Sequence, residues 1–504
     1  MGDGFPIVLT ADRTLTAGYQ LLFDGMLAAS QTTTSPPALL APLLMPRAPS
    51  DGVRARVAPL GLRRIEAALL AGGFGADQVV VADDAHLAQA IGPRTRIVGI
   101  CSGEPAGLGM NSNTMAAVAG GRIYPQAMFF RLLRALGRAT RKAGASPKVV
   151  LGGPGAWQAA NDDSLRAALR IDHVVLGYAE DNAPRIFGDL LHGRPLPAVI
   201  EGGWGPASTI PPIRFPSTMG VVEISRGCGW GCSFCTISRV NMVHLPPATI
   251  LSDVRTNVQA GVANIAAISE DFFRYGATGT RVNPEALMSL LADIGQVRGL
   301  GLIQIDHANI ASIAQFSDEQ LARVHRLLVR DRPHRYLWVN VGVETASGEL
   351  LKSSGSAGKL AGTPADGWGQ LCADQVRRLC AVGLFPMVSL IIGLPGETDS
   401  HVRQTLAWVR SLSNLRISVF PMLHAPIDGA APPDPRALKP LHWELVRTCY
   451  DLNFRWIPRM YWDNQTAAGE RLLRRLMLQI LGRGQVLQWK ALFALHSFRA
   501  RTWR

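Results

Sequence analysis

Short apolar runs alternate with amphipathic stretches along much of the chain, first over residues 58–190. Residues 60–71 follow a helical period, whereas residues 79–82 form an unbroken apolar run. Strands that are apolar on both faces are typical of a parallel sheet covered by helices. The predicted strands are 79–82, 96–101, 148–151 and 172–177. We therefore expect an α/β fold, with a doubly wound, Rossmann-like domain over residues 58–190.

A second alternation of strands and helices occupies residues 218–425. Helical patterns such as residues 247–260, 318–329 and 399–412 separate the strands. The predicted strands are 220–225, 263–269, 301–306, 337–343, 385–392 and 417–420. Six βα units in a row predict a parallel sheet curled into a partial (β/α)6 barrel, with its chemistry at the C-terminal ends of the strands.

Three segments lie outside these alternations. Residues 1–57 are expected to be an irregular segment that packs on the next domain, and residues 191–217, rich in Pro and Gly, to be a linker. Residues 426–504 are expected to form a C-terminal helical cap. Within this cap, residues 471–504 are basic and apolar by turns, which suits either a membrane surface or, more commonly, packing on the protein itself.

The composition narrows the classes of protein that these elements allow. A chain of 504 residues with 47% hydrophobic residues is long enough for several domains and is not globally disordered. Its net charge of +13, carried mainly by Arg, fits anionic partners as well as it fits a solvated basic surface. We see neither a signal peptide nor an apolar run of about twenty residues, so we expect a cytoplasmic protein without a membrane span.

The most specific signal is a group of thiols directly after the first predicted barrel strand. Cys228, Cys232 and Cys235 have the spacing C-x3-C-x2-C on a glycine-rich loop. Such a loop of thiolates suits a soft metal, either zinc or iron–sulfur. A structural zinc site needs four ligands, and no fourth Cys or His lies close by in the sequence. Three Cys on a cubane leave one iron open, so the spacing favours an iron–sulfur cluster over zinc.

This motif, with the aromatic Phe234 directly before the third Cys, resembles the signature of the radical S-adenosylmethionine (SAM) superfamily. Residues 339–352 resemble the fourth strand of that family's barrel, and residues 391–398 resemble its fifth strand and turn. The resemblance covers about residues 218–425. It implies that the three Cys hold a 4Fe-4S cluster whose open iron chelates SAM.

The resemblance also implies which residues contact SAM. Phe234 would neighbour the adenine, and Glu344 and Gly393 would line the site from the fourth and fifth strands. Glu270 and Asp271 occupy the place of the carboxylates that take the SAM ammonium group, with Glu270 our choice for this contact. The family's Gly-Gly-Glu motif is replaced here by Ile-Ser-Glu-Asp. A carboxylate at this place could also ligate the open iron, and Asp271 could simply begin a surface loop.

An α/β domain before such a barrel resembles the cobalamin-dependent branch of the superfamily. The start of the helix at residues 59–64 and the strand ends near residues 98–100, 150–157 and 175–180 are similar to that branch. The resemblance implies cobalamin contacts from two groups of residues. The arginines are Arg63 and Arg64, near the lower face, and the glycines are Gly99, Gly152, Gly153, Gly155 and Gly177.

Other ligands are less well matched by this domain. His86 lies in Asp-Ala-His without the Gly of the cobalt-ligating motif, so we expect cobalamin to bind without a His below it. No G-x-G-x-x-G follows the first predicted strand, which disfavours NAD. A domain that binds nothing remains an alternative.

The remaining polar residues and thiols carry weaker signals. Cys101, Cys372, Cys380 and Cys449 form no second cluster motif, which disfavours auxiliary-cluster enzymes such as methylthiotransferases and suggests buried, inert thiols. Several polar residues near predicted strand ends are candidates for substrate contact. They are Tyr275, Asp306, His307 and His424.

Together these resemblances imply a cobalamin-dependent radical SAM enzyme and, within that branch, a C-methyltransferase. The methyl group of SAM would pass via methylcobalamin to an unactivated carbon of a small-molecule or peptide natural product. Whether SAM is also cleaved to a radical stays open. We expect an electron donor such as flavodoxin or ferredoxin and no nucleic acid. Two alternatives remain: a cobalamin-containing radical SAM cyclase or rearrangement enzyme without methyl transfer, and a basic metal-bearing nucleic-acid-binding protein.

Overall fold

The structure is a computed structural model that describes residues 2–330, 332, 335–427, 434 and 437–502. The chain divides into two units. The first contains Met1–Ala116, Gly120–Val222 and Leu245–Ala263, and the second contains Ala117–Ala119, Glu223–His244 and Asn264–Arg504.

A six-stranded parallel sheet forms the centre of the first unit, with strand order β4-β1-β5-β6-β7-β8. The strands are β1 (Ile7–Ala11), β4 (Val79–Val81), β5 (Ile97–Cys101), β6 (Lys148–Gly152), β7 (His173–Leu176) and β8 (Val199–Glu201). Val8 of β1 pairs with Val80 on one side and with Val98 on the other. From β1 the strand order runs to β4 on one side and then to β5 and the later strands on the other side. Sheets of this kind bind ligands at the carboxyl ends of the strands where the order reverses, here between β1 and β5.

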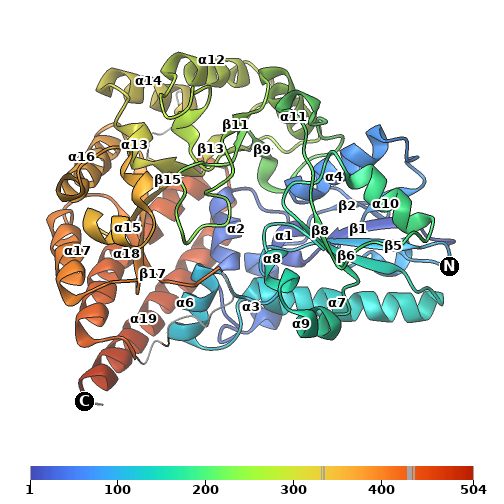
Figure 1. Cartoon of the computed structure of the whole chain (residues 1–504), viewed down its shortest axis with the longest axis horizontal. Helices are drawn as coiled ribbons and strands as arrows, with labels where there is room; N and C mark the ends of the chain where they lie inside the picture. The colour runs from blue at the N-terminus through green and yellow to red at the C-terminus, as the bar shows by residue number, and fades with distance from the viewer. Residues whose placement is uncertain (1, 331, 333–334, 428–433, 435–436, 503–504) are drawn as a thin grey trace. The chain divides into compact units, whose positions relative to one another are not determined.

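Helices cover both faces of this sheet (Figure 1). On one face, α7 (Tyr124–Ala143) buries Phe129 and Leu132 against the strands. On the other, α4 (Leu60–Ala71) and α10 (Ala183–Leu191) bury Leu69 and Phe187. The smaller elements are α1 (Arg13–Thr16), α2 (Leu22–Ala29), α3 (Pro37–Leu44), β2 (Ser50–Asp51), β3 (Arg54–Ala55), α5 (Leu87–Ala90), α6 (Met110–Ala119), α8 (Trp157–Ala160) and α9 (Asp163–Leu169). The predicted doubly wound α/β fold is confirmed.

The ends of this unit differ from the sequence expectation. Residues 1–57, expected to be irregular, contain β1, a central strand whose five side chains are all buried. Residues 191–217, expected to be a linker, contain β8, the last strand of the sheet. Both strands are short and bounded by Gly, Pro and Thr residues, so their apolar runs carry little signal by themselves.

The predicted barrel strands form two sheets, and all residues of these sheets except Val221 and Val222 belong to the second unit. One has the order β13-β12-β9 and the other the order β14-β15-β16-β17, in which neighbouring strands are parallel. The strands are β9 (Val221–Glu223), β12 (Ile265–Ile268), β13 (Ile303–Ile305), β14 (His307–Asn309), β15 (Trp338–Glu344), β16 (Phe385–Ile392) and β17 (Ser418–Leu423). The predicted strand 301–306 contains β13 and ends at Asp306, and β14 follows directly beyond it. A short hairpin of β10 (Ser225–Arg226) and β11 (Val243–His244) follows β9.

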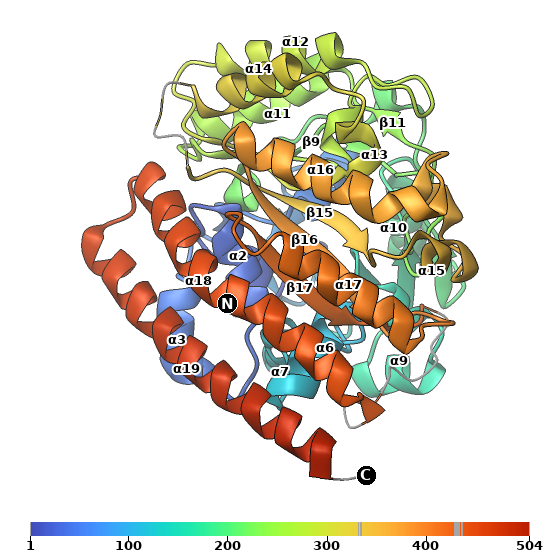
Figure 2. The ribbon, with the colours of Figure 1, turned by 90° about the vertical axis from the view of Figure 1, so that its left-hand side faces the viewer.

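Helices pack on the outside of these strands (Figure 2). They are α12 (Pro284–Gly295), α13 (Ile310–Ile313), α14 (Asp318–Val329), α15 (Gly348–Ser353), α16 (Trp368–Ala381) and α17 (Asp399–Ser411). The predicted helical C-terminal region is confirmed as two long helices, α18 (Pro440–Ala467) and α19 (Leu472–Thr502). Among the described residues, no helix combines the length and apolar character needed to cross a membrane.

One helix belongs to a different unit from its neighbours in sequence. α11 (Pro247–Gln259) follows β11 of the second unit but belongs to the first. Its buried Asp253 forms an ion pair with the guanidinium group of Arg64 on α4, and Asp253 Oδ1 also accepts a hydrogen bond from the Ile213 amide at 2.9 Å. A buried ion pair therefore joins α11 to α4.

Candidate functional site

The three predicted cluster cysteines lie on the loop after β10, and glycine makes this loop possible. Gly227, Gly229 and Gly231 have φ values of 77°, 73° and 71°, a left-handed region that favours glycine. A Cβ atom on Gly227 would lie 2.6 Å from the carbonyl oxygens of residues 240 and 241. The Cys228 amide donates to the Val240 carbonyl at 2.9 Å, which closes the loop.

The chemistry of the thiols fits an iron–sulfur cluster. Burial raises the pKa of Cys228 to about 12 and also raises the pKa of Cys232, so both side chains are neutral thiols when no cation is bound. A cationic cluster would favour the thiolate forms. In the described part of the chain, no three Cys, His, Asp or Glu side chains are close enough to hold a single metal ion. A four-iron cluster makes a different demand, because each thiolate binds its own iron.

An arginine and a short helical turn hold this loop in place. Arg274 donates hydrogen bonds to the carbonyls of Cys228 at 2.7 Å and Gly279 at 2.8 Å. Its guanidinium group also lies 4.8 Å from the ring centroid of Trp230. A 3-10 turn, η4 (Ala357–Leu360), approaches the loop so closely that a Cβ atom on Gly358 would lie 2.0 Å from the Trp230 carbonyl. The turn η4 thereby brings Lys359 toward the thiols.

Lys359 forms a buried ion pair with Glu344 at the end of β15. Glu344 has a φ of 65° beside a register shift between β15 and β16, and its Oε2 accepts from Ser389 Oγ at 3.2 Å. The Lys359 ammonium lies 5.9 Å from the ring centroid of the buried Phe234. Burial by itself lowers the pKa of Lys359, but Glu344 and then Cys232 raise it above its ordinary value, so the side chain is cationic.

The two carboxylates after β12 have different surroundings. Asp271 accepts hydrogen bonds from the Asn309 amide at 3.1 Å and from the Ser312 hydroxyl. Glu270 has a buried Oε2 without a partner among the described residues. Burial raises the pKa of Glu270 to about 7, and the carboxylates of Glu223 and Asp306 add to this rise. Of the two candidates, Glu270 is therefore the one with an oxygen available to a cationic ligand.

His307 joins the same group of charges. Its Nδ1 lies 2.9 Å from Asp306 Oδ2, and its ring is half-exposed. Partial loss of water around the ring lowers the pKa of His307, but Asp306, Glu270 and Glu344 together raise it above its ordinary value. We call Glu223, Glu270, Asp306, His307, Glu344 and Lys359 the strand-end cluster. Four carboxylates face two basic groups of the cluster and Arg226, which pairs with Glu223, so the carboxylates still outnumber the basic groups and favour a ligand that carries positive charge.

The other predicted residues of this unit have partners of their own. Gly393 has a φ of 83°, and its amide donates to Glu397 Oε1 at 3.0 Å, so this amide is engaged within its own turn. Tyr275 is buried, and its ring lies edge-on to His244 at 5.5 Å between centroids. The amide of His424 continues the pairing beyond β17 by donating to the Ile392 carbonyl at 2.9 Å. Their contacts with SAM or substrate stay predictions.

In the first unit, the five predicted glycines fall into two groups. Gly99, Gly153 and Gly155 pack against protein, since a Cβ atom on each would lie within 2.7 Å of another atom. Gly152 and Gly177, at the carboxyl ends of β6 and β7, have no other atom within 4 Å of such a Cβ. These two glycines leave open space at the edge of the sheet where a ligand is expected, and this space fits the close approach of a bulky group such as a corrin.

Asp12 is a further candidate at this edge that the sequence analysis missed. It follows β1, beside the point where the strand order reverses, and its side chain is fully buried. Oδ1 accepts from the Thr14 amide at 2.8 Å, whereas Oδ2 has no partner among the described residues. Burial raises the pKa of Asp12 to about 7. A strand ending in Asp was the signal, but it was hidden because β1 itself was not predicted.

The two predicted arginines are both buried and hydrogen-bonded to protein. Arg63 donates to the carbonyls of Pro216 at 2.9 Å and Ala55 at 2.8 Å, and to Glu66 Oε2 at 2.8 Å. Arg64 donates to the Pro211 carbonyl at 2.8 Å and pairs with Asp253. These contacts describe a structural role inside the unit, and a contact of either arginine with cobalamin stays a prediction.

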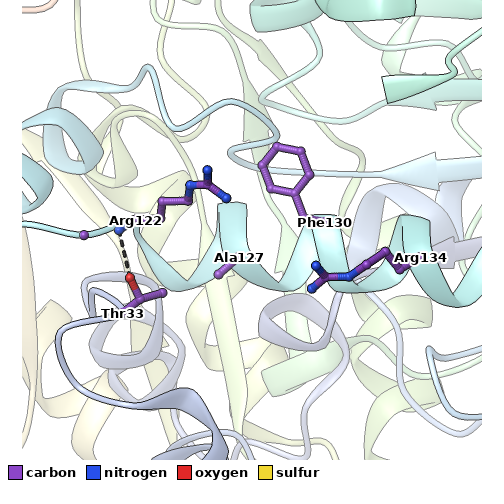
Figure 3. A pocket seen from close by; sticks show the side chains of 6 residues that line it. Thr33, Arg122, Ala127, Phe130 and Arg134 are labelled. Atoms are coloured by element: carbon purple, nitrogen blue, oxygen red, sulfur yellow. Dashed lines mark hydrogen bonds between the residues drawn. The ribbon is translucent and has the colours of Figure 1, made fainter. Parts of the chain in front are cut away.

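A separate surface pocket of about 520 Å³ lies along the first half of α7 (Figure 3). Phe130 lines it between the guanidinium groups of Arg122 and Arg134, with Thr33 at one end. The Arg122 guanidinium lies 5.4 Å from the ring centroid of Phe130, and the Arg122 amide donates to Thr33 Oγ1 at 3.0 Å. The two guanidinium groups suit an anion, although both arginines are exposed to water. None of the site residues predicted from the sequence lines this pocket.

Lys359 and Glu223 were missed by the sequence analysis as members of the strand-end cluster. Lys359 lies 15 residues beyond Glu344 on η4 and belongs to no recognisable motif. Glu223 ends β9 and pairs with Arg226 at 2.8 Å. The position of Glu223 at a strand end was a usable signal, whereas only the fold brings Lys359 to the thiol loop.

Comparisons with known proteins place this site in a recognised context. Residues 222–409 match the family model described as the radical SAM superfamily. The ribosomal protein uS12 methylthiotransferase RimO of Oleidesulfovibrio alaskensis is 26% identical over 235 residues, which are 44% of this chain and 49% of that protein. The tRNA-2-methylthio-N(6)-dimethylallyladenosine synthase of Halorhodospira halophila is 27% identical over 207 residues, 40% of each chain. The chain thus matches less than half the length of these relatives.

A solved structure resembles more of the chain. It is that of TsrM from Kitasatospora setae, a radical S-adenosylmethionine methyltransferase with cobalamin and a [4Fe-4S] cluster bound. The match has a TM-score of 0.53 and 16% sequence identity, and it covers 84% of this chain and 74% of that one. At this identity the likeness shows a shared fold, which extends beyond residues 222–409 into the remainder of the chain.

Proposed function

We propose that this chain, whose residues 222–409 form a radical SAM domain, is a cobalamin-dependent radical SAM methyltransferase that acts on a small-molecule or peptide natural product. One observation carries the proposal: the thiol loop of Cys228, Cys232 and Cys235 lies in the same unit as Glu270, whose buried Oε2 has no partner within the described part of the chain. Thiols for a cluster and a carboxylate for an ammonium group are the two contacts that a cluster-bound SAM needs. The fold shared with TsrM supports cobalamin as the second cofactor.

Different residues of the second unit would bind different groups of SAM. The three cysteines hold the cluster, Glu270 accepts from the ammonium group of SAM, and Phe234 packs against its adenine. Lys359 and Glu344 hold each other in a buried ion pair, which keeps both charges fixed beside the bound cofactor. When bound, the cluster supplies an electron for cleaving SAM, and cobalamin supplies a carrier for the methyl group.

The residues of the first unit provide the site for cobalamin. Gly152 and Gly177 leave open the carboxyl ends of β6 and β7, so the flat ring can approach the backbone. The loop after β5 is held in place because Gln158 on α8 donates to Glu104 at 2.7 Å and accepts from the Ala106 amide at 2.9 Å. A fixed loop keeps the edge of the sheet open for its ligand.

Metal analysis of the reconstituted protein tests the two-cofactor proposal. The protein would be purified without oxygen, supplied with iron, sulfide and cobalamin, and assayed for iron, cobalt and zinc. We expect about four irons and one cobalt per chain in the wild type. Cys228→Ala should lose the iron but keep the cobalt, because its thiol is not in the cobalamin unit. Cys380→Ala, which removes a cysteine of α16, is the matched control and should keep both metals.

Other metal contents would exclude parts of the proposal. Iron without cobalt would leave radical SAM chemistry in place but exclude cobalamin-dependent methyl transfer, and zinc alone would exclude both. With both cofactors present, mass spectrometry of candidate substrates separates the remaining reactions. A product heavier by one methyl group supports the methyltransferase, whereas a mass-neutral or oxidised product supports a cyclase or rearrangement enzyme.

The methylthiotransferase relatives suggest a second candidate function. Sulfur insertion would draw on a second group of cysteines, yet the other four cysteines are spread over β5, α16 and α18. Cys372 and Cys449 are fully buried, and burial raises the pKa of each. These thiols fit inert core positions, so we favour methyl transfer. A nucleic-acid-binding role would instead appear as salt-sensitive affinity for RNA.

We infer that the enzyme works in the cytoplasm with a reductant such as flavodoxin or ferredoxin. A radical SAM domain requires an electron for each reductive cleavage, and reduced thiols persist in that compartment. The rate of SAM cleavage with reduced flavodoxin, compared with the rate with dithionite, measures whether flavodoxin can supply the electron.

A further inference from the structure

One side of α19 is packed against the protein. Leu478 and Phe493 are each only 3% exposed. Trp489 stacks on Tyr450 of α18 with centroids 5.6 Å apart, and His496 stacks on Trp443 at 4.7 Å. These contacts fix which side of the 31-residue helix faces α18, and within the described part of the chain the side chains on the opposite side are exposed.

That opposite side is apolar along almost the whole helix. At 100° per residue, its exposed large side chains fall within an arc about 140° wide. Ile480 is 73% exposed and Leu487 is 70% exposed. We call this the outer face of α19, and its main residues are Leu473, Met477, Ile480, Leu487, Leu495 and Phe498. Exposed apolar surface that continues over a helix about 45 Å long marks an interaction site.

The charge around the outer face is of one sign. Residues 471–504 contain eight Lys and Arg residues and no Asp or Glu. Arg483 and Lys490 are exposed along one edge of the face, and Arg499 is exposed along the other. By contrast, Arg474 is paired with Glu470 at 2.6 Å on the side toward the protein. The partner of the outer face must therefore be apolar at its centre and negative at its margins.

We propose that the outer face of α19 lies on the surface of a membrane that carries anionic lipids. An apolar arc of this width with basic residues at its edges matches a helix that lies in a lipid interface. A second copy of the chain fits less well, because a helix pair needs a narrower seam and opposite charges at its edges. Here the two helices would bring Arg and Lys against Arg and Lys.

Sedimentation of the cofactor-loaded protein with lipid vesicles tests this proposal. The probes are vesicles of phosphatidylcholine with and without phosphatidylglycerol. We expect the wild type to bind the anionic vesicles and to be released as salt rises. Ile480→Asp with Leu487→Asp should weaken binding about tenfold or more, because the apolar contact is lost. Arg483→Glu with Lys490→Glu should weaken binding to anionic vesicles only.

The control places the same change on another exposed leucine. Leu39 on α3 is 76% exposed, so Leu39→Asp should bind vesicles as the wild type does. Wild type that ignores both vesicles would overturn the proposal, as would equal binding by the α19 variants. Two further results would also overturn it: a wild-type dimer in ultracentrifugation that Ile480→Asp converts to monomer, and a large fall in melting temperature for Ile480→Asp, which would mean that the protein itself covers the face.

Discussion

Neighbouring carboxylates differ in whether their oxygens are available to a ligand. Asp271 accepts hydrogen bonds from the amide of Asn309 and the hydroxyl of Ser312, whereas Glu270 Oε2 is buried without a partner among the described residues. The family resemblance placed both at the SAM ammonium group and favoured Glu270. The contacts supply the physical reason for this preference, because the direction of a side chain at a strand end depends on the neighbouring strands.

We expect Glu270→Gln to weaken SAM binding while leaving the iron content unchanged. The amide keeps the size of the side chain but loses the charge that attracts an ammonium group, so affinity should fall about tenfold or more. Equilibrium dialysis of the reconstituted protein with SAM measures the loss. Glu285→Gln, at an exposed carboxylate on α12, is the control and should bind normally. Unchanged affinity of Glu270→Gln would assign the ammonium contact to another residue.

The same comparison applies to Asp12 at the end of β1. Its pKa, raised by burial to about 7 in the folded state, lies above the ordinary value of 3.8, so ionisation opposes folding. Below about pH 4 the carboxyl is neutral in both states. As the pH rises from about 4 to 7, the unfolded chain releases this proton first, and stability falls. Above about pH 7 the loss is complete.

Asp12→Asn should therefore remove part of this pH dependence. The amide oxygen can still accept from the Thr14 amide, but the group no longer ionises. We expect the variant to gain stability over the wild type between about pH 4 and 7, by at most about 4 kcal/mol. Urea unfolding across this range measures it, with the exposed Asp163→Asn as control. Parallel curves for wild type and Asp12→Asn would show that the carboxyl titrates normally.

At the scale of the elements, the apolar pattern predicted strands and helices well wherever a run was long or repeated. The helix predicted at 60–71 and the strand predicted at 385–392 end where the structure ends them. β1 was missed because its short run of four apolar residues and Thr10 stands alone near the start of the chain. The predicted third barrel strand ends at Asp306, where the chain continues as β14 and pairs with β15. Pairing partners of this kind are set by tertiary contacts.

The buried ion pair between α4 and α11 gives a prediction at this scale. Asp253→Ala leaves the guanidinium group of Arg64 buried without its carboxylate, which should cost about 3–5 kcal/mol of unfolding free energy. Urea unfolding of the variant measures this cost. Arg64→Met combined with Asp253→Leu should recover part of the loss, because no charge is left buried without its partner, although the Ile213 amide and the Pro211 carbonyl lose their hydrogen bonds.

Cobalamin content of the same variants separates a structural from a ligand-binding role for Arg64. If the arginine only joins the helices, the double variant should bind cobalamin as the wild type does. Loss of cobalt in a double variant that is as stable as the wild type would indicate that Arg64 contributes to cobalamin binding.

For the whole molecule, the sequence motif predicts the site of the second unit, whereas the fold is needed to predict the site of the first. The cysteine spacing predicts the site of the second unit, because three thiols at fixed intervals are rare by chance. The first unit carries no comparable motif, and its glycines are alike in the sequence. The structure separates them, since Gly152 and Gly177 border open space and Gly99, Gly153 and Gly155 pack on protein. A site formed by backbone shape can be read only after the chain has folded.

This division predicts that the two cofactors can be removed one at a time. Gly177→Leu should lose most of the cobalamin and keep the iron, since its side chain would fill the space at the end of β7. Gly193→Leu is the matched control. Gly193 has a φ of 70°, close to the 78° of Gly177, and it likewise has no atom within 4 Å of a Cβ. It follows α10 rather than a strand end, so the backbone strain is matched while the ligand edge is untouched.

Iron and cobalt analysis of both glycine variants decides the matter. Cobalt lost from Gly177→Leu alone assigns the carboxyl edge of the first sheet to cobalamin. Equal loss in both variants would mean that strain at a positive φ destabilises the unit, and full retention in both would place cobalamin elsewhere. Loss of iron together with cobalt in Gly177→Leu would show that the units load their cofactors in one coupled step, and the separate sites inferred here would have to be treated as a single one.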